Sequence, residues 1–225
     1  MKLHFLLLLI FATASGCKNK PSASADPVEN RYFRLYNEIY NQWGKEPADS
    51  TRQKLNAYLQ EFPENAAAQM LAGNLAYSLA DYEKAISSYR LAIALQPQQA
   101  VYYSALGTVY NVQQQTDSAE KYLMKALALQ DSSPYTYLNV ALLYAKTGNR
   151  QKSFAFADSA YTKGNTLPIV CSGLSFVFCE WKEAGKSNRL YEEAVTLGLK
   201  DTPAFKQVLN GKMPLEDYYR TSYMR

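Results

Sequence analysis

Residues 100–133 read AVYYSALGTVYNVQQQTDSAEKYLMKALALQDSS, and the small residues Gly107, Ala119 and Ala126 within them recur every 34 positions along the chain. The three series are Gly73, Gly107, Ala141 and Ser175; Ala85, Ala119, Ser153 and Ser187; and Ala92, Ala126, Ala160 and Ala194. A repeat of this length is typical of helix-turn-helix units that are stable only when they stack on their neighbours. The sequence therefore predicts an all-α array of helix pairs, which presents extended surfaces rather than catalytic pockets.

The composition argues against catalysis and against nucleic-acid binding. His4 is the single histidine of the chain, so the commonest general base and metal ligand is scarce. The net charge of +4 comes from scattered residues, without a basic block that could follow a phosphate backbone. We expect no catalytic residues, no metal, no cofactor and no nucleic-acid partner. An envelope enzyme that uses only carboxylates stays open as an alternative.

Two cysteines, Cys171 and Cys179, lie eight residues apart on one predicted helix. This spacing separates their Cα atoms by about 12 Å, whereas a disulfide needs less than ~7 Å. We therefore expect these two residues not to be bonded to each other.

The N-terminal residues are typical of a cleaved signal peptide. Lys2 precedes the apolar run 5–12, and Ala14-Ser15-Gly16 then lead to Cys17. The small residues before Cys17 resemble a bacterial lipobox, although Ala14 departs from the usual aliphatic residue. This resemblance implies that residues 1–16 are removed and that Cys17 is the lipid-attachment residue. An ordinary secretory peptide cut near Ala14 is the alternative.

Residues 18–30 contain Pro, Ser and Ala without apolar periodicity, so the segment is predicted to be a disordered tether. No acidic cluster follows Cys17, which argues against the surface-export signal of some Bacteroidota lipoproteins. We therefore expect an outer-membrane lipoprotein that faces the periplasm.

The 34-residue pattern resembles that of the tetratricopeptide repeat (TPR) family, in which positions 8, 20 and 27 of each repeat are small. Repeats begin at Ala66, Ala100, Pro134 and Pro168 in this frame. The second repeat matches the family pattern best, through Tyr103, Leu106, Gly107, Tyr110, Ala119, Leu123 and Ala126. The resemblance implies a right-handed α-solenoid with a concave face and a C-terminal capping helix. The whole chain is thus interpreted as a Bacteroidota-like bacterial TPR lipoprotein.

The predicted organisation has five parts, and two helix starts have their own signals. The parts are a signal peptide at 1–16, a lipidated cysteine and tether at 17–30, a degenerate helical repeat at 31–65, four TPR repeats at 66–201, and a capping helix with a tail at 202–225. Ser133 before Pro134 predicts one helix start, and Asp117 with Glu120 predicts another as a capping box.

The family resemblance also implies where a partner binds, because TPR ligands lie along the first helix of each repeat. The implied groove consists of Met70, Asn74, Tyr77, Ser104, Thr108, Asn111, Tyr135, Lys146, Ser172, Cys179 and Glu180. Most of these side chains are uncharged, which suits an extended or helical peptide. They can instead pack against neighbouring helices, and this alternative stays open.

We therefore expect a membrane-anchored scaffold that binds a protein or peptide partner in this groove, with homo-oligomers possible. A structural spacer that associates with itself is a second hypothesis. Tyr218, Tyr219 and Tyr223 in the tail either cap the array or contact a partner.

Overall fold

The computed structural model describes residues 31–35, 37–38, 48–199, 206–208, 210 and 212, and none of these residues lies in a β-strand. The helices are α3 (Ala48–Glu61), α4 (Ala66–Ser78), α5 (Tyr82–Leu95), α6 (Ala100–Val112), α7 (Thr116–Ala128), α8 (Pro134–Lys146), α9 (Arg150–Gly164), α10 (Pro168–Glu180) and α11 (Ala184–Thr196). Over these ranges, no helix has both the length and the apolarity that crossing a membrane requires.

Several sequence-based predictions lie outside the described residues. These are the signal peptide, Cys17, the tether and the tyrosines of the tail. Only a part of the predicted capping helix is described, and Lys206–Val208 within it are helical.

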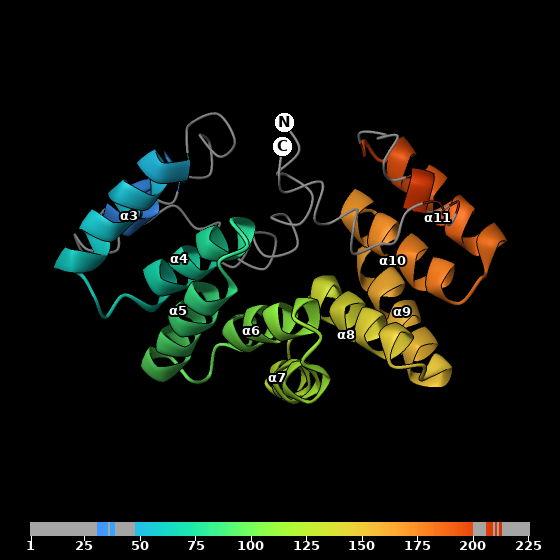
Figure 1. Cartoon of the computed structure of the whole chain (residues 1–225), viewed down its shortest axis with the longest axis horizontal. Coiled ribbons are helices and arrows are strands. Elements are labelled where there is room, and N and C mark those ends of the chain that lie inside the picture. Colours follow the sequence, from blue (N-terminus) through green and yellow to red (C-terminus); the bar gives the residue numbers. More distant parts are fainter. Residues whose placement is uncertain are drawn as a thin grey trace.

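The helices pack as successive pairs that together form an arc (Figure 1). The pairs are α4 with α5, α6 with α7, α8 with α9, and α10 with α11, and α3 packs against α4 at the start of the series. The helices α4, α6, α8 and α10 lie on the inner side of the arc, and we call them the inner layer. Their partners α5, α7, α9 and α11 form the outer layer. The predicted all-α solenoid of stacked helix pairs is confirmed.

The glycines at position 8 of a repeat allow the two helices of a pair to approach each other. A Cβ atom added at Gly73 would lie 2.5 Å from a ring carbon of Tyr89. At Gly107 the added atom would lie 2.7 Å from Cγ of Leu123 and 3.0 Å from its backbone nitrogen. Contacts this short do not occur in proteins, so an added Cβ would force the facing side chain or the facing helix to move.

A serine replaces alanine at position 20 in the third and fourth repeats, and a hydrogen bond to the facing helix explains why it fits. Ser153 Oγ donates to the Ala141 carbonyl at 3.0 Å, and Ser187 Oγ donates to the Ser175 carbonyl at 2.8 Å. Both hydroxyl groups are buried, and the hydrogen bonds satisfy them.

The turn inside each helix pair contains one residue with a left-handed backbone, again at intervals of 34 residues. These residues are Ala80, Gln114, Gly148 and Lys182, with φ of 58°, 60°, 78° and 58°. The next amide donates to the carbonyl five residues earlier at 2.9 Å, in the pairs Asp81–Ala76, Gln115–Tyr110, Asn149–Tyr144 and Glu183–Phe178. This hydrogen bond closes the end of the inner-layer helix. Only glycine adopts a positive φ without strain, and in three of the four turns this position holds another residue.

The second helix of each pair starts at the residue that follows the left-handed turn. Asp81 and Asn149 are N-caps there, since their side chains accept hydrogen bonds from the amides of Lys84 and Lys152. The prediction that Asp117 caps its helix was wrong, because α7 begins at Thr116 and Gln115 is the N-cap. The turn geometry sets this helix start, even though the Gln115 side chain accepts no capping hydrogen bond. Ser133 before Pro134 does precede α8, as predicted.

Gly148 and Gln114 occupy the same turn position and allow a paired test of backbone strain. We predict that Gly148→Ala destabilises the protein by about 1 kcal/mol, because φ is +78° and the added Cβ meets no atom within 4 Å. Gln114→Gly is expected to stabilise it by a few tenths to ~1 kcal/mol. Urea midpoints from circular dichroism would measure both changes, and shifts of the same sign would contradict the prediction.

Candidate partner-binding face

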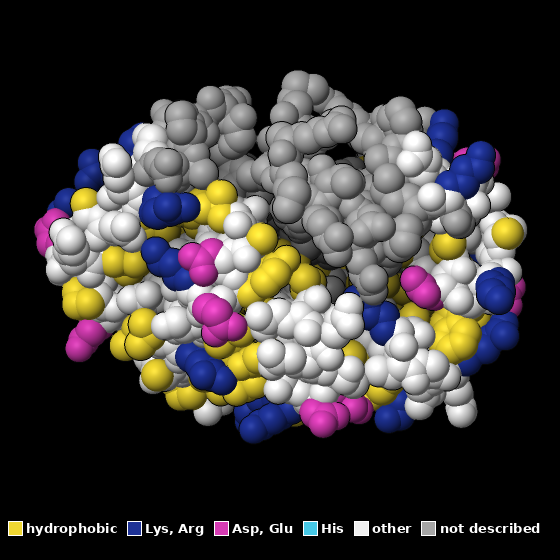
Figure 2. Space-filling view, in the orientation of Figure 1, with side chains coloured by type: hydrophobic (Ala, Val, Ile, Leu, Met, Phe, Trp, Pro, Cys, Tyr) yellow, Lys and Arg dark blue, Asp and Glu magenta, His cyan; other side chains and the backbone are white. Residues whose placement is uncertain are grey.

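The inner layer is almost free of charge. Its four helices have 13 residues each, and the charged side chains among them are Lys146 and Glu180, at the last positions of α8 and α10. Every outer-layer helix contains at least three charged residues. Figure 2 shows that both signs of charge are scattered over the visible outer surface. The inner-layer helices therefore differ in charge from the outer-layer helices.

The predicted groove residues all lie on the four inner-layer helices, but most of them are buried. The buried ones are Met70, Asn74, Tyr77, Ser104, Thr108, Asn111, Tyr135 and Ser172. Cys179 is half-buried, whereas Lys146 and Glu180 are exposed. The Asn, Ser and Thr side chains of this set form hydrogen bonds inside the protein, as follows.

Ser104 belongs to a chain of hydrogen bonds that ends on a carboxylate. Thr136 Oγ1 donates to Asp131 Oδ2 at 2.5 Å, and Asp131 Oδ1 also accepts from the Ser133 amide at 2.9 Å. The Ser104 and Thr136 hydroxyl oxygens are 2.6 Å apart. Because Thr136 has one proton and gives it to Asp131, Ser104 is the donor of this last bond. Asp131 thereby holds the start of α8 against α6.

Thr108 and Asn111 continue this polar contact along the same two helices. Asn139 Nδ2 donates to Thr108 Oγ1 at 2.8 Å, and Thr108 Oγ1 donates to the Ser104 carbonyl at 2.8 Å. Asn111 Nδ2 donates to the Asn139 carbonyl at 3.4 Å. We call Ser104, Thr108, Asn111, Thr136 and Asn139 the polar seam. It joins α6 to α8 at the middle of the inner layer.

Sequence reasoning missed Asp131, Thr136 and Asn139, which are half of this network. None of them occupies a position that the TPR pattern marks as small, bulky or ligand-binding. The available signal in the sequence was a threonine and an asparagine within a mostly apolar predicted helix, since polar groups that become buried need hydrogen-bond partners.

The seam between α8 and α10 is apolar by contrast. A Cβ atom added at Gly173 would lie 2.4 Å from Cδ2 of Leu138, so α10 presses directly on α8. Leu138 and Phe176 are buried on this side of the polar seam. The contact between α6 and α8 is therefore polar, whereas the contact between α8 and α10 is apolar.

Three other predicted residues, Asn74, Ser172 and Cys179, form hydrogen bonds elsewhere in the fold. Asn74 Oδ1 accepts a hydrogen bond from the Tyr89 hydroxyl at 2.7 Å, and burial raises the pKa of Tyr89 well above its usual value. Ser172 Oγ donates to the Ile169 carbonyl at 3.0 Å. Cys179 Sγ donates to the Val208 carbonyl at 3.7 Å.

The two cysteines of α10 are not bonded to each other, as predicted. Burial raises the pKa of the Cys171 thiol to about 11, and the nearby Glu193 carboxylate adds to this effect. Burial also raises the pKa of Cys179, with a further contribution from Glu180. Both residues are therefore protonated near neutral pH and are weak nucleophiles.

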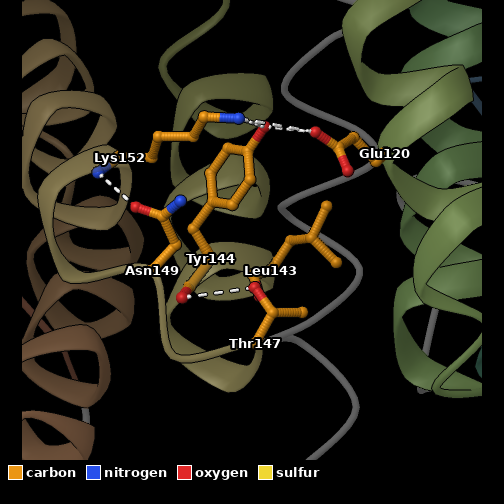
Figure 3. A network of polar contacts seen from close by, with 6 residues as sticks. All are labelled: Glu120, Leu143, Tyr144, Thr147, Asn149 and Lys152. Atoms are coloured by element: carbon orange, nitrogen blue, oxygen red, sulfur yellow. Dashed lines mark hydrogen bonds and ion pairs between the residues drawn. The ribbon is translucent and has the colours of Figure 1, made fainter.

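A second polar network, on the other side of α8, joins the second repeat to the third (Figure 3). The Tyr144 hydroxyl donates to Glu120 Oε1 at 2.5 Å, and Lys152 Nζ donates to the Tyr144 hydroxyl at 3.2 Å. Lys152 Nζ also lies 4.6 Å from the centre of the Tyr144 ring. Burial raises the pKa of Tyr144, and the hydrogen bond to Glu120 raises it further. The equivalent pair in the next repeat is Lys186 over Phe178, at 5.3 Å.

Lys152 and its equivalent are therefore part of the repeat packing. The recurrence of one lysine–aromatic contact after 34 residues indicates a role in stacking the repeats rather than in chemistry. Among the described residues, no three His, Cys, Asp or Glu side chains gather where they could hold a metal ion. On the inner layer, Glu180 is the only carboxylate, whereas the carboxylate-enzyme hypothesis needs a pair.

Comparison with known proteins identifies the repeats. Residues 66–99 and 100–132 match the family model described as tetratricopeptide repeat. Human protein O-mannosyl-transferase TMTC1 is 31% identical over 121 residues, which cover 54% of this chain. The chain spans 13% of the length of that curated relative.

Several solved structures have the same fold and align with most of this chain, although their sequence identity to it is low. PilW, described as a widely conserved type IV pilus biogenesis factor, has a TM-score of 0.67 and 17% identity over 88% of this chain and 92% of its own. A tetratricopeptide repeat protein of Parabacteroides merdae has a TM-score of 0.64 and 20% identity over 95% of this chain and 81% of its own. YrrB, described as a TPR protein with an unusual peptide-binding site, has a TM-score of 0.50 and 13% identity over 76% of this chain and 90% of its own.

Residues 66–132 thus match tetratricopeptide repeats, and the described part of the chain folds as a TPR-like solenoid. This fold indicates a protein–protein interaction scaffold, and proteins built from such repeats are in general not catalysts. The sequence-based expectation of a binding scaffold is confirmed at this level.

Tyr135 at the start of α8 gives the fold a measurable pH dependence. Burial raises the pKa of its phenol to about 12, against an ordinary value of 10.0. The unfolded chain therefore loses this proton before the folded chain does, and stability falls as pH rises from about 10 to 12. We predict that Tyr135→Phe loses less stability than the parent over this window. Urea midpoints at pH 8, 10 and 11.5 would test this, and parallel losses in both proteins would contradict it.

Proposed function

We propose that this chain is a lipid-anchored scaffold of the bacterial envelope whose inner layer holds a protein or peptide partner. The observation that carries the proposal is the charge distribution, because four helices facing one side of the arc contain only Lys146 and Glu180 as charged residues. A surface of this kind favours a partner segment without charge at its centre. The polar seam holds the middle of this layer, and the contact between α8 and α10 beside it is apolar.

The anchoring part of the proposal rests on the sequence. A short apolar run followed by Ala14-Ser15-Gly16-Cys17 resembles a lipobox, and a lipidated Cys17 would keep the repeats at the membrane. We place the protein at the periplasmic side of the outer membrane. The fold shared with PilW supports an accessory role in an envelope assembly, and this step is an analogy at the level of the fold.

Anchoring is tested by removing the lipid-attachment residue. We predict that Cys17→Ala moves the protein from the membrane fraction to the soluble fraction and abolishes labelling by a palmitate analogue. Detergent phase partition of cell lysates would measure the first effect. A Cys17→Ala protein that stays in the membrane fraction would show that the anchor lies elsewhere.

Partner binding is tested by photo-crosslinking in intact cells. Leu142 is a half-buried residue of the inner layer, and Met124 on α7 is 40% exposed in the outer layer. We predict that p-benzoylphenylalanine in place of Leu142 gives one dominant adduct with another envelope protein, whereas the same label at Met124 does not. Mass spectrometry would identify the adduct.

The two labels also separate the adaptor from the spacer. Adducts formed only between copies of this chain would favour the self-associating spacer. The same adducts from both positions would show that binding does not select the inner layer.

A further inference from the structure

The network of Glu120, Tyr144 and Lys152 recurs one repeat later with phenylalanine in place of its acidic residue. In the first network, Lys152 Nζ lies 4.6 Å from the centre of the Tyr144 ring and 3.8 Å from Glu120 Oε1 (Figure 3). The residues 34 positions further along the chain are Phe154, Phe178 and Lys186. The lysine and the ring beneath it are therefore kept, whereas the carboxylate and the tyrosine hydroxyl are replaced by apolar groups.

Lys186 is held over two aromatic rings without a carboxylate partner. Its Nζ lies 5.3 Å from the centre of the Phe178 ring and 5.6 Å from the centre of the Phe154 ring. Among the described residues, no acidic side chain forms an ion pair with Lys186. Glu183, three residues earlier in the sequence, forms its ion pair with Arg150. The positive charge of Lys186 is therefore not neutralised as that of Lys152 is.

A second cation lies on the same aromatic group. The guanidinium carbon of Arg150 is 5.0 Å from the centre of the Phe154 ring and 5.7 Å from that of Trp181. Trp181 Nε1 donates to Ser153 Oγ at 3.0 Å, which fixes the indole against α9. The rings hold both cations in place, so less side-chain freedom is lost when an anion binds. The cation–aromatic cluster consists of Arg150, Phe154, Phe178, Trp181 and Lys186.

The surface beside this cluster is open. A Cβ atom added at Gly185 would meet no atom within 4 Å. The side chains of Arg150 and Lys186 are exposed, and Phe154 and Trp181 are half-buried. An anionic group from outside the protein can therefore reach Lys186 and contact the rings next to it.

We propose that the cation–aromatic cluster binds an acidic side chain of a partner protein, which takes the place that Glu120 has in the preceding network. A carboxylate is the anion that suits this site, because the same lysine position pairs with one a repeat earlier. Phe154 and Trp181 offer apolar contacts to the residues next to that acidic side chain. None of the cluster residues belongs to the predicted groove, so this surface goes beyond the proposed function.

Trp181 reports directly on binding at this site. The chain has two tryptophans, so Trp43→Phe leaves Trp181 as the only one. We expect octaglutamate, added at low salt to this purified full-length protein, to change the Trp181 emission in a saturable way. Octaserine at the same concentrations is expected to leave the emission unchanged.

Three variants in the same background test which residues bind the peptide. Lys186→Gln is expected to weaken the apparent affinity for octaglutamate about two- to five-fold, the range for a single exposed ion pair. Phe154→Glu places a carboxylate at the position of Glu120, and we expect it to weaken the affinity as well. Lys125→Gln is the matched control, because Lys125 is also exposed and its Nζ lies 6.0 Å from the centre of the Tyr103 ring. We expect this control to leave the titration unchanged, with equal circular dichroism spectra for all variants.

Three results would overturn the proposal. The first is an emission that octaglutamate does not change, and the second is an equal loss of affinity from Lys125→Gln and Lys186→Gln. The third is a response to phosphatidylglycerol vesicles but not to octaglutamate, since the cluster would then bind a membrane surface. None of these results bears on the inner layer, which is tested separately by the partner adduct of the Leu142 label in cells.

Discussion

The structure depends on the close contact between the two helices of each pair. Where position 8 is glycine, even one additional carbon atom would come within 3 Å of the facing side chain, as at Gly73 and Gly107. The same contact accounts for the alanines at the other small positions and for the hydrogen bonds that let Ser153 and Ser187 replace alanine. Because every repeat meets this constraint at the same positions, the pairs stack in one direction and form an arc.

This packing also explains where the charges lie. The inner-layer helices α6, α8 and α10 each contact their own partner and also the outer-layer helix of the preceding pair, so few of their positions reach water. Burial of an unpaired charge is costly, and the inner layer has charges only at the helix ends, in Lys146 and Glu180. The outer-layer helices keep one face in solvent, and each of them contains at least three charged residues. A nearly neutral face is thus a direct result of the packing, and it is also the feature on which the proposed function rests.

The polar seam holds the middle of the inner layer together. Ser104, Thr108 and Asn111 join α6 to α8 through Thr136, Asn139 and Asp131. Buried polar groups in such networks are costly to leave unsatisfied. The positions of these groups are therefore set by the fold itself.

The sequence by itself determined the repeat length, the starts of the helix pairs and the neutral character of one layer, because these follow from local periodicity and from residue size. Gly107, Ala119 and Ala126 predict the close contacts without any knowledge of the partners that they face. It did not determine which polar side chains meet, since Thr136 and Asn139 reach Ser104 and Thr108 only when the second and third repeats stack. It also predicted the wrong cap for α7, because the left-handed turn at Gln114 sets the start of that helix and leaves Asp117 within its first turn. Contacts between repeats depend on the rotation of one helix pair against the next, and only the tertiary structure decides that rotation.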